Sequence, residues 1–186
     1  MSRLLLILII TLSFQTLTNA DDIRDFEIEG ISLGDSALDY FNVSTIKKNS
    51  WNYYKDKAFI PVQNDKLPFF KTYDFFDFRY RKGDKKYIMQ SISGIIDFKN
   101  KDLSKCIQLK KKIIDEIKLI IPNMEFIEYD KTSSRGTKGY YYQSSFFSDK
   151  GNISIICYDY FETDNYLAVS ISNKNYENFL LNNPYK

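Results

Sequence analysis

The stretch 74–121 constrains the fold most, because a predicted β-hairpin runs directly into a predicted amphipathic helix. Asp74–Arg81 alternates between two sets of side chains, which is typical of a half-buried strand. Phe76, Phe78 and Tyr80 fall on one face, and Phe75, Asp77 and Arg79 fall on the other. Lys82–Lys85 predicts the reversal, since its Gly83 tolerates a positive φ. The isoleucine-rich Lys86–Phe98 predicts the returning strand.

A helix is predicted over Asp102–Ile121, with Asp102 as its N-cap and Pro122 beyond its end. Its apolar residues recur at helical spacing: Leu103, Cys106, Ile107, Ile113, Ile114, Ile117, Ile120 and Ile121. A helix with one apolar side packs against a sheet with one apolar side. We therefore expect an α+β fold, in which this one long amphipathic helix lies across one face of a mostly antiparallel, twisted sheet.

The flanking segments complete the predicted sheet and add short N- and C-terminal helices. Before the hairpin, the patterns predict helices over Ser36–Phe41 (capped by Asp35) and Thr45–Lys48 (capped by Ser44), and a strand over Lys57–Gln63. After the long helix, they predict strands over Met124–Tyr129, Tyr140–Ser148, Asn152–Phe161 and Tyr166–Ser172, then a helix over Lys174–Leu181 capped by Asn173. The last three strands predict a meander.

The first twenty residues have the pattern of an export signal. Arg3 supplies a short positive start, Leu4–Leu12 is an almost unbroken apolar run, and Thr18–Ala20 offers small residues for cleavage. The apolar run is too short to span a bilayer, which takes roughly 20 residues. We expect a signal peptide over 1–20, a single domain over 21–186, and a periplasmic or secreted protein without a transmembrane anchor; the alternative is an uncleaved anchor.

The two cysteines, Cys106 and Cys157, indicate a disulfide in an exported chain. Cys106 lies on the apolar stripe of the predicted helix, and Cys157 lies in a predicted buried strand, so the bond would attach helix to sheet. The alternative is two separate buried thiols. A redox or catalytic cysteine is disfavoured, because the chain has no C-x-x-C motif and no histidine to activate a thiolate.

Composition excludes several classes of function. Lys and Arg total 26 against 24 Asp and Glu, a balance that argues against a nucleic-acid partner. The absence of histidine removes the usual general base and the commonest metal ligand. No nucleotide-binding, hydrolase-elbow or metalloprotease motif occurs. We therefore expect no cofactor and no metal site.

Two segments are candidate binding sites. Trp51, Tyr53 and Tyr54 form an aromatic cluster that could stack on a sugar or a peptide ring; the alternative is that they cover the edge of the core. Residues 130–139 form a polar loop, in which Lys131, Arg135 and Lys138 could hold an anion; the alternative is a solvated connection.

Some motifs carry a resemblance to known families. Gly30–Phe41 resembles the opening of many small exported bacterial domains, as in the lipoprotein of the outer-membrane assembly machinery and β-lactamase-inhibitor-like modules. Together with Asp21–Gly30, Ser91–Gly94 and Asn183–Lys186, it makes the chain resemble a family of uncharacterised exported proteins from small-genome marine bacteria. This resemblance implies an envelope location, and it supplies no catalytic residue.

We expect a non-catalytic binding or envelope-associated module, whose partner is a protein, a glycan or an outer-membrane component. The alternative is a small carboxylate-dependent hydrolase that acts on an envelope polymer. The two differ in what they require: a binding module needs an exposed aromatic or apolar patch, and an enzyme needs a pocket with converging acids. A purely structural role would need neither.

Overall fold

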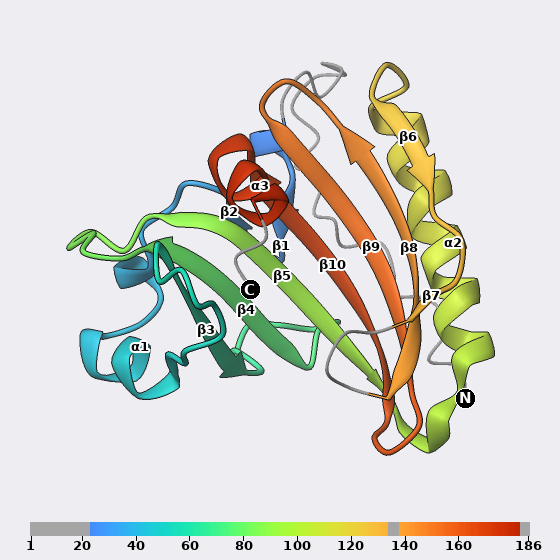
Figure 1. Ribbon diagram of the computed structural model, residues 1–186, viewed down its shortest axis with the longest axis horizontal. Coiled ribbons are helices and arrows are strands. Elements are labelled where there is room, and N and C mark those ends of the chain that lie inside the picture. The colour runs from blue at the N-terminus through green and yellow to red at the C-terminus, as the bar shows by residue number, and fades with distance from the viewer. Residues whose placement is uncertain (1–22, 134–137, 183–186) are drawn as a thin grey trace.

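The computed structural model describes residues 23–133 and 138–182 as an α+β fold built on one large antiparallel sheet (Figure 1). The strand order is β3-β4-β5-β10-β9-β8-β6, and the short β7 pairs with β8. The strands are β3 (Phe59–Asp65), β4 (Phe75–Arg81), β5 (Met89–Phe98), β6 (Glu125–Glu128), β7 (Thr132–Ser133), β8 (Gly139–Phe147), β9 (Gly151–Tyr160) and β10 (Asn165–Asn173). The predicted α+β class and antiparallel sheet are confirmed.

Three α-helices accompany this sheet: α1 (Val43–Asn49), α2 (Leu103–Ile120) and α3 (Lys174–Leu181). A separate two-stranded hairpin, β1 (Glu27–Ile28) and β2 (Ile31–Ser32), lies near the described N-terminus. Single 3-10 turns occupy η1 (Ile23–Asp25), η2 (Ala37–Asp39) and η3 (Lys99–Lys101). Figure 1 shows α2 behind β6 and alongside β8, and α3 in front of the sheet. Helix α2 packs on β9 and β10 from one side and α3 packs on them from the other, so helices contact both faces.

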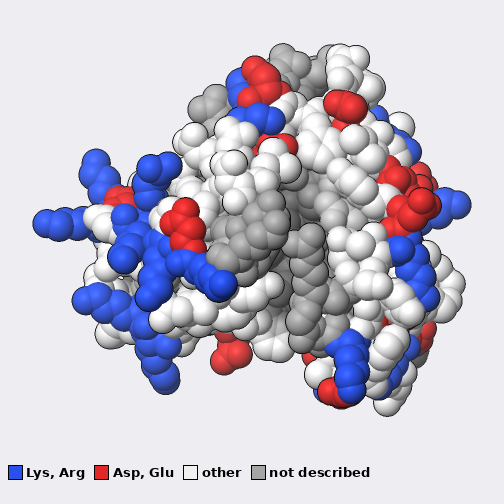
Figure 2. Space-filling view, viewed as in Figure 1, with Lys and Arg blue, Asp and Glu red and all other residues white. Residues whose placement is uncertain are grey.

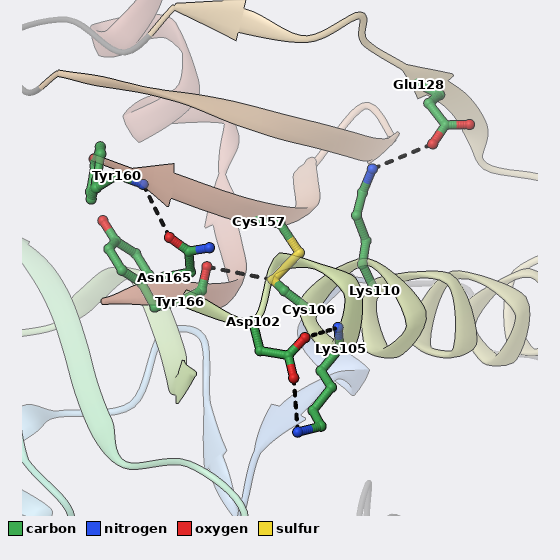
Figure 3. The surroundings of a disulfide bond; sticks show 9 residues. All are labelled: Asp102, Lys105, Cys106, Lys110, Glu128, Cys157, Tyr160, Asn165 and Tyr166. Carbon is green, nitrogen blue, oxygen red and sulfur yellow. Dashed lines mark hydrogen bonds and ion pairs between the residues drawn. A yellow bond between two sulfur atoms is a disulfide. The ribbon is translucent and has the colours of Figure 1, made fainter. Parts of the chain in front are cut away.

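The face of the sheet toward α2 holds the main apolar core. A continuous row of apolar side chains crosses it in register: Val62, Phe78, Ile92, Ile171, Ile153 and Phe146. Helix α2 contributes buried Cys106, Ile114 and Ile117 to the same core. The disulfide between Cys106 and Cys157 joins α2 to β9, as predicted (Figure 3). This disulfide and the fold it ties together are compatible with export.

The opposite face of the sheet is polar along most of its length, and we call it the polar face. Alternation along β4 and β5 places Asp77, Arg79, Ser91 and Ser93 there. Helix α3 covers one end of the polar face, where Tyr176 and Phe179 pack with Tyr54 and Phe59 in a second, smaller core. The same sheet thus has one apolar face and one polar face.

Several predicted boundaries are wrong by a few residues. The segment expected to form a helix over Ser36–Phe41 holds only the 3-10 turn Ala37–Asp39, capped by the Ser36 hydroxyl rather than by Asp35. The cap of α1 is Asn42, whose side chain accepts a hydrogen bond from the Thr45 amide, and not Ser44. The strand expected over Lys57–Gln63 is β3, two residues further on. The loop 130–139 contains the short strand β7.

Other local predictions match the structure. Gly83 has a φ of +85° in the turn between β4 and β5. Asp102 accepts a hydrogen bond from the Lys105 amide as the N-cap of α2. The meander is β8, β9 and β10, and α3 spans Lys174–Leu181 with Asn173 as its cap. The predicted signal segment 1–20 lies outside the described residues.

Candidate functional site

Serine pairs run across the polar face where neighbouring strands meet. Ser91 and Ser172 hydroxyls lie 2.9 Å apart, and Ser93 and Ser170 hydroxyls lie 2.8 Å apart. Ser145 and Ser154 form a third such pair at 2.8 Å between β8 and β9. Each pair satisfies its hydroxyls across the strands, so this face stays polar although much of it is buried.

An ion pair between Asp77 and Arg79 lies beside these serines. Arg79 Nη2 lies 3.6 Å from Asp77 Oδ2, and Arg79 Nη1 donates a hydrogen bond to Ser93 Oγ at 3.1 Å. Both side chains are largely buried, with 19% of Arg79 and 11% of Asp77 exposed. Two of their atoms, Arg79 Nε and Asp77 Oδ1, are buried and make no hydrogen bond with any described residue.

The pKa values of this pair reflect its surroundings. Burial raises the pKa of Asp77 above its ordinary value, and the charge of Arg79 opposes part of that rise. Burial lowers the pKa of Arg79, but the neighbouring Tyr176 and Asp77 outweigh it, so this pKa lies above its ordinary value. Of the two side chains, Asp77 is therefore the one whose charged form is destabilised, because its carboxylate is poorly solvated.

Tyrosines from β9 and β10 gather beside the pair. The Tyr158 and Tyr166 rings stack with centroids 4.4 Å apart, and Tyr160 lies 5.6 Å from Tyr158. Burial raises the pKa of Tyr158 and of Tyr166, and Tyr158 also responds to the charges of Tyr160 and Arg79. Their phenol groups therefore belong to the same electrostatic neighbourhood as Arg79.

The aromatic cluster predicted as a binding site reaches this neighbourhood from the segment before β3. Trp51 and Tyr53 are 43% and 49% exposed, and their rings lie 4.8 Å apart. Burial raises the pKa of Tyr53, which Tyr160 and Arg79 also influence. Tyr54 is only 5% exposed and its hydroxyl hydrogen-bonds to that of Tyr176. Trp51 and Tyr53 thus form an exposed platform, whereas Tyr54 covers core, as the alternative interpretation held.

In the predicted basic loop, the two described lysines, Lys131 and Lys138, each contact another side chain. The Lys131 ammonium lies 3.7 Å from the centroid of the Tyr140 ring, a cation–π contact. The Lys138 ammonium lies 3.4 Å from a Glu162 oxygen. Arg135 lies outside the described residues. The use of these cations for anion binding stays a prediction.

A cavity of about 80 Å³ opens between α2 and the apolar face of the sheet, opposite the polar face. Its walls are mostly apolar and come from the N-terminal hairpin, α2 and the central strands: Phe26, Ile28, Tyr73, Ile96, Leu109, Ile113, Ile117, Ile153, Val169 and Ile171. Glu27, Thr72 and Glu116 are its polar members. A volume of this size suits a few carbon atoms, about half of a cavity that binds benzene.

Sequence reasoning missed Asp77, Arg79 and the serine pairs as candidate site residues. A signal was present, because Ser-Ile-Ser occurs at 91–93 and again at 170–172. Two such strands, paired in register, place four hydroxyls on one face. Nothing in the sequence alone pairs strands about 80 residues apart.

Within residues 23–133 and 138–182, no group of three or more acidic, cysteine or histidine side chains is placed to hold a metal ion. No helix of that described part has the length and apolar character that crossing a membrane requires. Comparison of the chain with protein-family models, with curated proteins and with solved structures found no match.

Proposed function

We propose that this protein is an exported, non-catalytic binding module of the cell envelope that recognises a neutral saccharide on its polar face. The observation that carries the proposal is the exposed Trp51–Tyr53 platform, in which Tyr53 is close enough to the buried Asp77–Arg79 pair to be influenced by the charge of Arg79. The resemblance to exported marine bacterial proteins supports the envelope location. The long amphipathic helix expected over Asp102–Ile121 covers the other face in this proposal and leaves the polar face to the ligand.

The platform matches the apolar side of a sugar ring. Pyranose rings present a patch of C–H groups, and aromatic faces attract such groups while excluding water. Trp51 and Tyr53 expose nearly half of their surface, and the tilt of 49° between their rings offers two differently inclined faces. Trp51 and Tyr53 are exposed side by side, and a contiguous exposed apolar patch marks an interaction site in a way that a single exposed side chain does not.

The buried pair supplies the polar half of such a site. Arg79 Nε is a donor and Asp77 Oδ1 an acceptor, and neither has a hydrogen-bond partner among the described residues. Because both atoms are buried, neighbouring hydroxyls of a sugar can accept from one and donate to the other once the side chains that cover the pair move aside on binding. Because the two side chains cancel each other's charge, the site favours a neutral ligand over an anion.

Fluorescence tests the proposal directly, because Trp51 is the only tryptophan of the chain. Titration with soluble neutral oligosaccharides, such as the trimer of N-acetylglucosamine, should change the Trp51 emission in a saturable way. Tyr53→Ala should weaken binding by up to about tenfold, the value of one aromatic contact. Asp77→Asn should weaken it by about tenfold or more, since a hydrogen bond to a charged group is lost.

Phe69→Ala is the matched control, because Phe69 is 50% exposed and packs on Phe70 of the main core. This variant should bind as the wild type does. Equal weakening by all three substitutions, or no saturable response to any neutral saccharide, would contradict the proposal. Turnover of the saccharide that Asp77→Asn abolishes would instead assign the carboxylate-dependent hydrolase, the alternative drawn from the sequence.

A further inference from the structure

Basic side chains gather at one end of the molecule, over α1 and the turn between β4 and β5 (Figure 2). Eight exposed residues make up this surface, which we call the basic end: Lys47, Lys48, Lys55, Lys57, Arg81, Lys82, Lys85 and Lys86. The fold brings the two chain segments together, since the Lys82 amide donates to the Ala58 carbonyl at 2.8 Å. The basic end is therefore one surface and not two.

Its charge stands out against that of the whole protein. Segments 42–58 and 81–86 contain these eight basic residues and two acidic ones, Asp56 and Asp84, a net charge of +6. The entire chain carries +2. The rest of the protein is therefore negative by four charges, and the molecule is strongly polarised.

The cations of the basic end are not neutralised locally. None of the eight forms an ion pair with a described residue. The two carboxylates serve the backbone instead: Asp84 accepts from the Lys86 and Ile88 amides, and Asp56 accepts from the Ala58 amide. On α2, by contrast, Lys105, Lys110 and Lys112 each pair with a carboxylate.

Exposed apolar side chains accompany the positive charge. Val43 is 39% exposed and stands one helical turn before Lys47 on α1. Leu38 is 41% exposed in η2, whose neighbour Ser36 hydrogen-bonds to the Lys86 carbonyl. Asp39 follows Leu38 and is exposed, so Val43 is the anchor in the more positive surroundings. A soluble polyanion offers nothing to such side chains, whereas a bilayer interface does.

From this combination we infer that the basic end docks the protein on a bilayer that contains anionic phospholipids. The lysines contact the phosphate groups, and Val43 and Leu38 enter the interface between head groups and acyl chains. The inference rests on the charge and the exposed apolar side chains of the basic end, and it does not depend on the saccharide site.

Vesicle sedimentation tests this inference on the full chain. Vesicles of phosphatidylcholine with 30% phosphatidylglycerol should bind the protein in 50 mM NaCl, and pure phosphatidylcholine should bind far less. Replacing Lys47, Lys48, Lys85 and Lys86 with Gln should reduce binding several hundredfold, because each lysine contributes roughly fivefold at an anionic surface. Raising NaCl to 0.5 M should have a similar effect.

The matched control replaces Lys105, Lys111, Lys112 and Lys118 of α2 with Gln, which changes the net charge by the same amount. This variant should keep at least half of the binding. Val43→Asn should weaken vesicle binding severalfold and leave binding to heparin, a soluble polyanion, unchanged. Equal losses in both lysine variants would overturn the inference, as would binding to heparin or duplex DNA without binding to anionic vesicles. A comparison of variants in the same chain cancels any contribution of the apolar residues 4–12.

Discussion

Cys106 of α2 and Cys157 of β9 are covalently joined although 51 residues separate them in the chain, and their Cα atoms lie 6.0 Å apart. Figure 3 shows this bond between the helix and the strand. Both cysteine side chains are fully buried in the main core. The bond fixes the helix to β9, and the segment between the two cysteines contains β6, β7 and β8. It thereby closes most of the C-terminal half of the fold into one covalent loop.

Removal of this bond should lower the free energy of unfolding by about 4 kcal/mol, the chain-entropy value for a loop of this length. The Cys106→Ala, Cys157→Ala double variant, followed by urea unfolding, gives the measurement. Wild type in the presence of reductant should show the same loss. An unfolding midpoint that neither treatment changes would show that other contacts already restrict the unfolded chain.

Lys110 gives a second test, because it is a buried ammonium on the inner side of α2. Its side chain is 6% exposed and its Nζ lies 3.3 Å from Glu128 Oε1, which also accepts from the Ser144 hydroxyl. Glu128→Gln should destabilise the protein by about 1–3 kcal/mol, since it leaves a buried cation without a counter-charge.

Lys110→Met is the companion variant, because it removes the charge and keeps most of the apolar length of the side chain. It should change the free energy of unfolding by less than Glu128→Gln does. Urea unfolding of the two variants at one pH ranks them. The reverse order would mean that the ion pair itself, and not the avoidance of an unpaired cation, stabilises this contact.

The hairpin from β4 to β5 shows how far local patterns determine the fold. Alternation correctly placed Phe76 and Phe78 in the core and Asp77 and Arg79 on the other face. The predicted start of the returning strand at Lys86 was wrong, because the Asp84 carboxylate binds the Lys86 and Ile88 amides and Tyr87 has a φ of +52°. An acidic side chain thus extends the turn by three residues.

The candidate site could be foreseen only in part, and the reason is distance along the chain. Trp51 and Tyr53 were identifiable as an unusual aromatic cluster within four residues. Their approach to Arg79 follows from the pairing of β3 with β4, whereas their approach to Tyr160 of β9 also depends on the pairing of β5 with β10. That pairing joins segments about 70 residues apart, and short-range periodicity carries no information on it.

Gly94 tests the packing around the cavity beneath α2. A Cβ atom on Gly94 would lie 2.5 Å from Cδ1 of the Tyr73 ring, which rests directly on the β5 backbone. Gly94→Ala should therefore cost about 1–3 kcal/mol of stability through overpacking. In a Tyr73→Ala background the same substitution should cost much less, because the ring that it meets is gone. Urea unfolding of the four proteins of this cycle gives the coupling; additive costs would show that the backbone, not Tyr73, resists the methyl group.

The contribution of Asp77 to the free energy of unfolding should depend on pH. Burial raises its pKa in the folded protein above the ordinary value of 3.8, and Arg79 offsets only part of this. The folded state therefore binds the proton more tightly than the unfolded chain, so this residue contributes stability at low pH that is lost as the pH rises from about 4 through the raised pKa.

The other acids of the chain titrate in the wild type and in Asp77→Asn alike. The free energy of unfolding of the wild type minus that of Asp77→Asn should thus decrease between pH 3.5 and pH 7, as urea unfolding at several pH values would measure. An increase over this range would mean that the attraction of Arg79 outweighs desolvation, and the carboxylate would then be a settled structural partner and a weaker candidate for ligand binding.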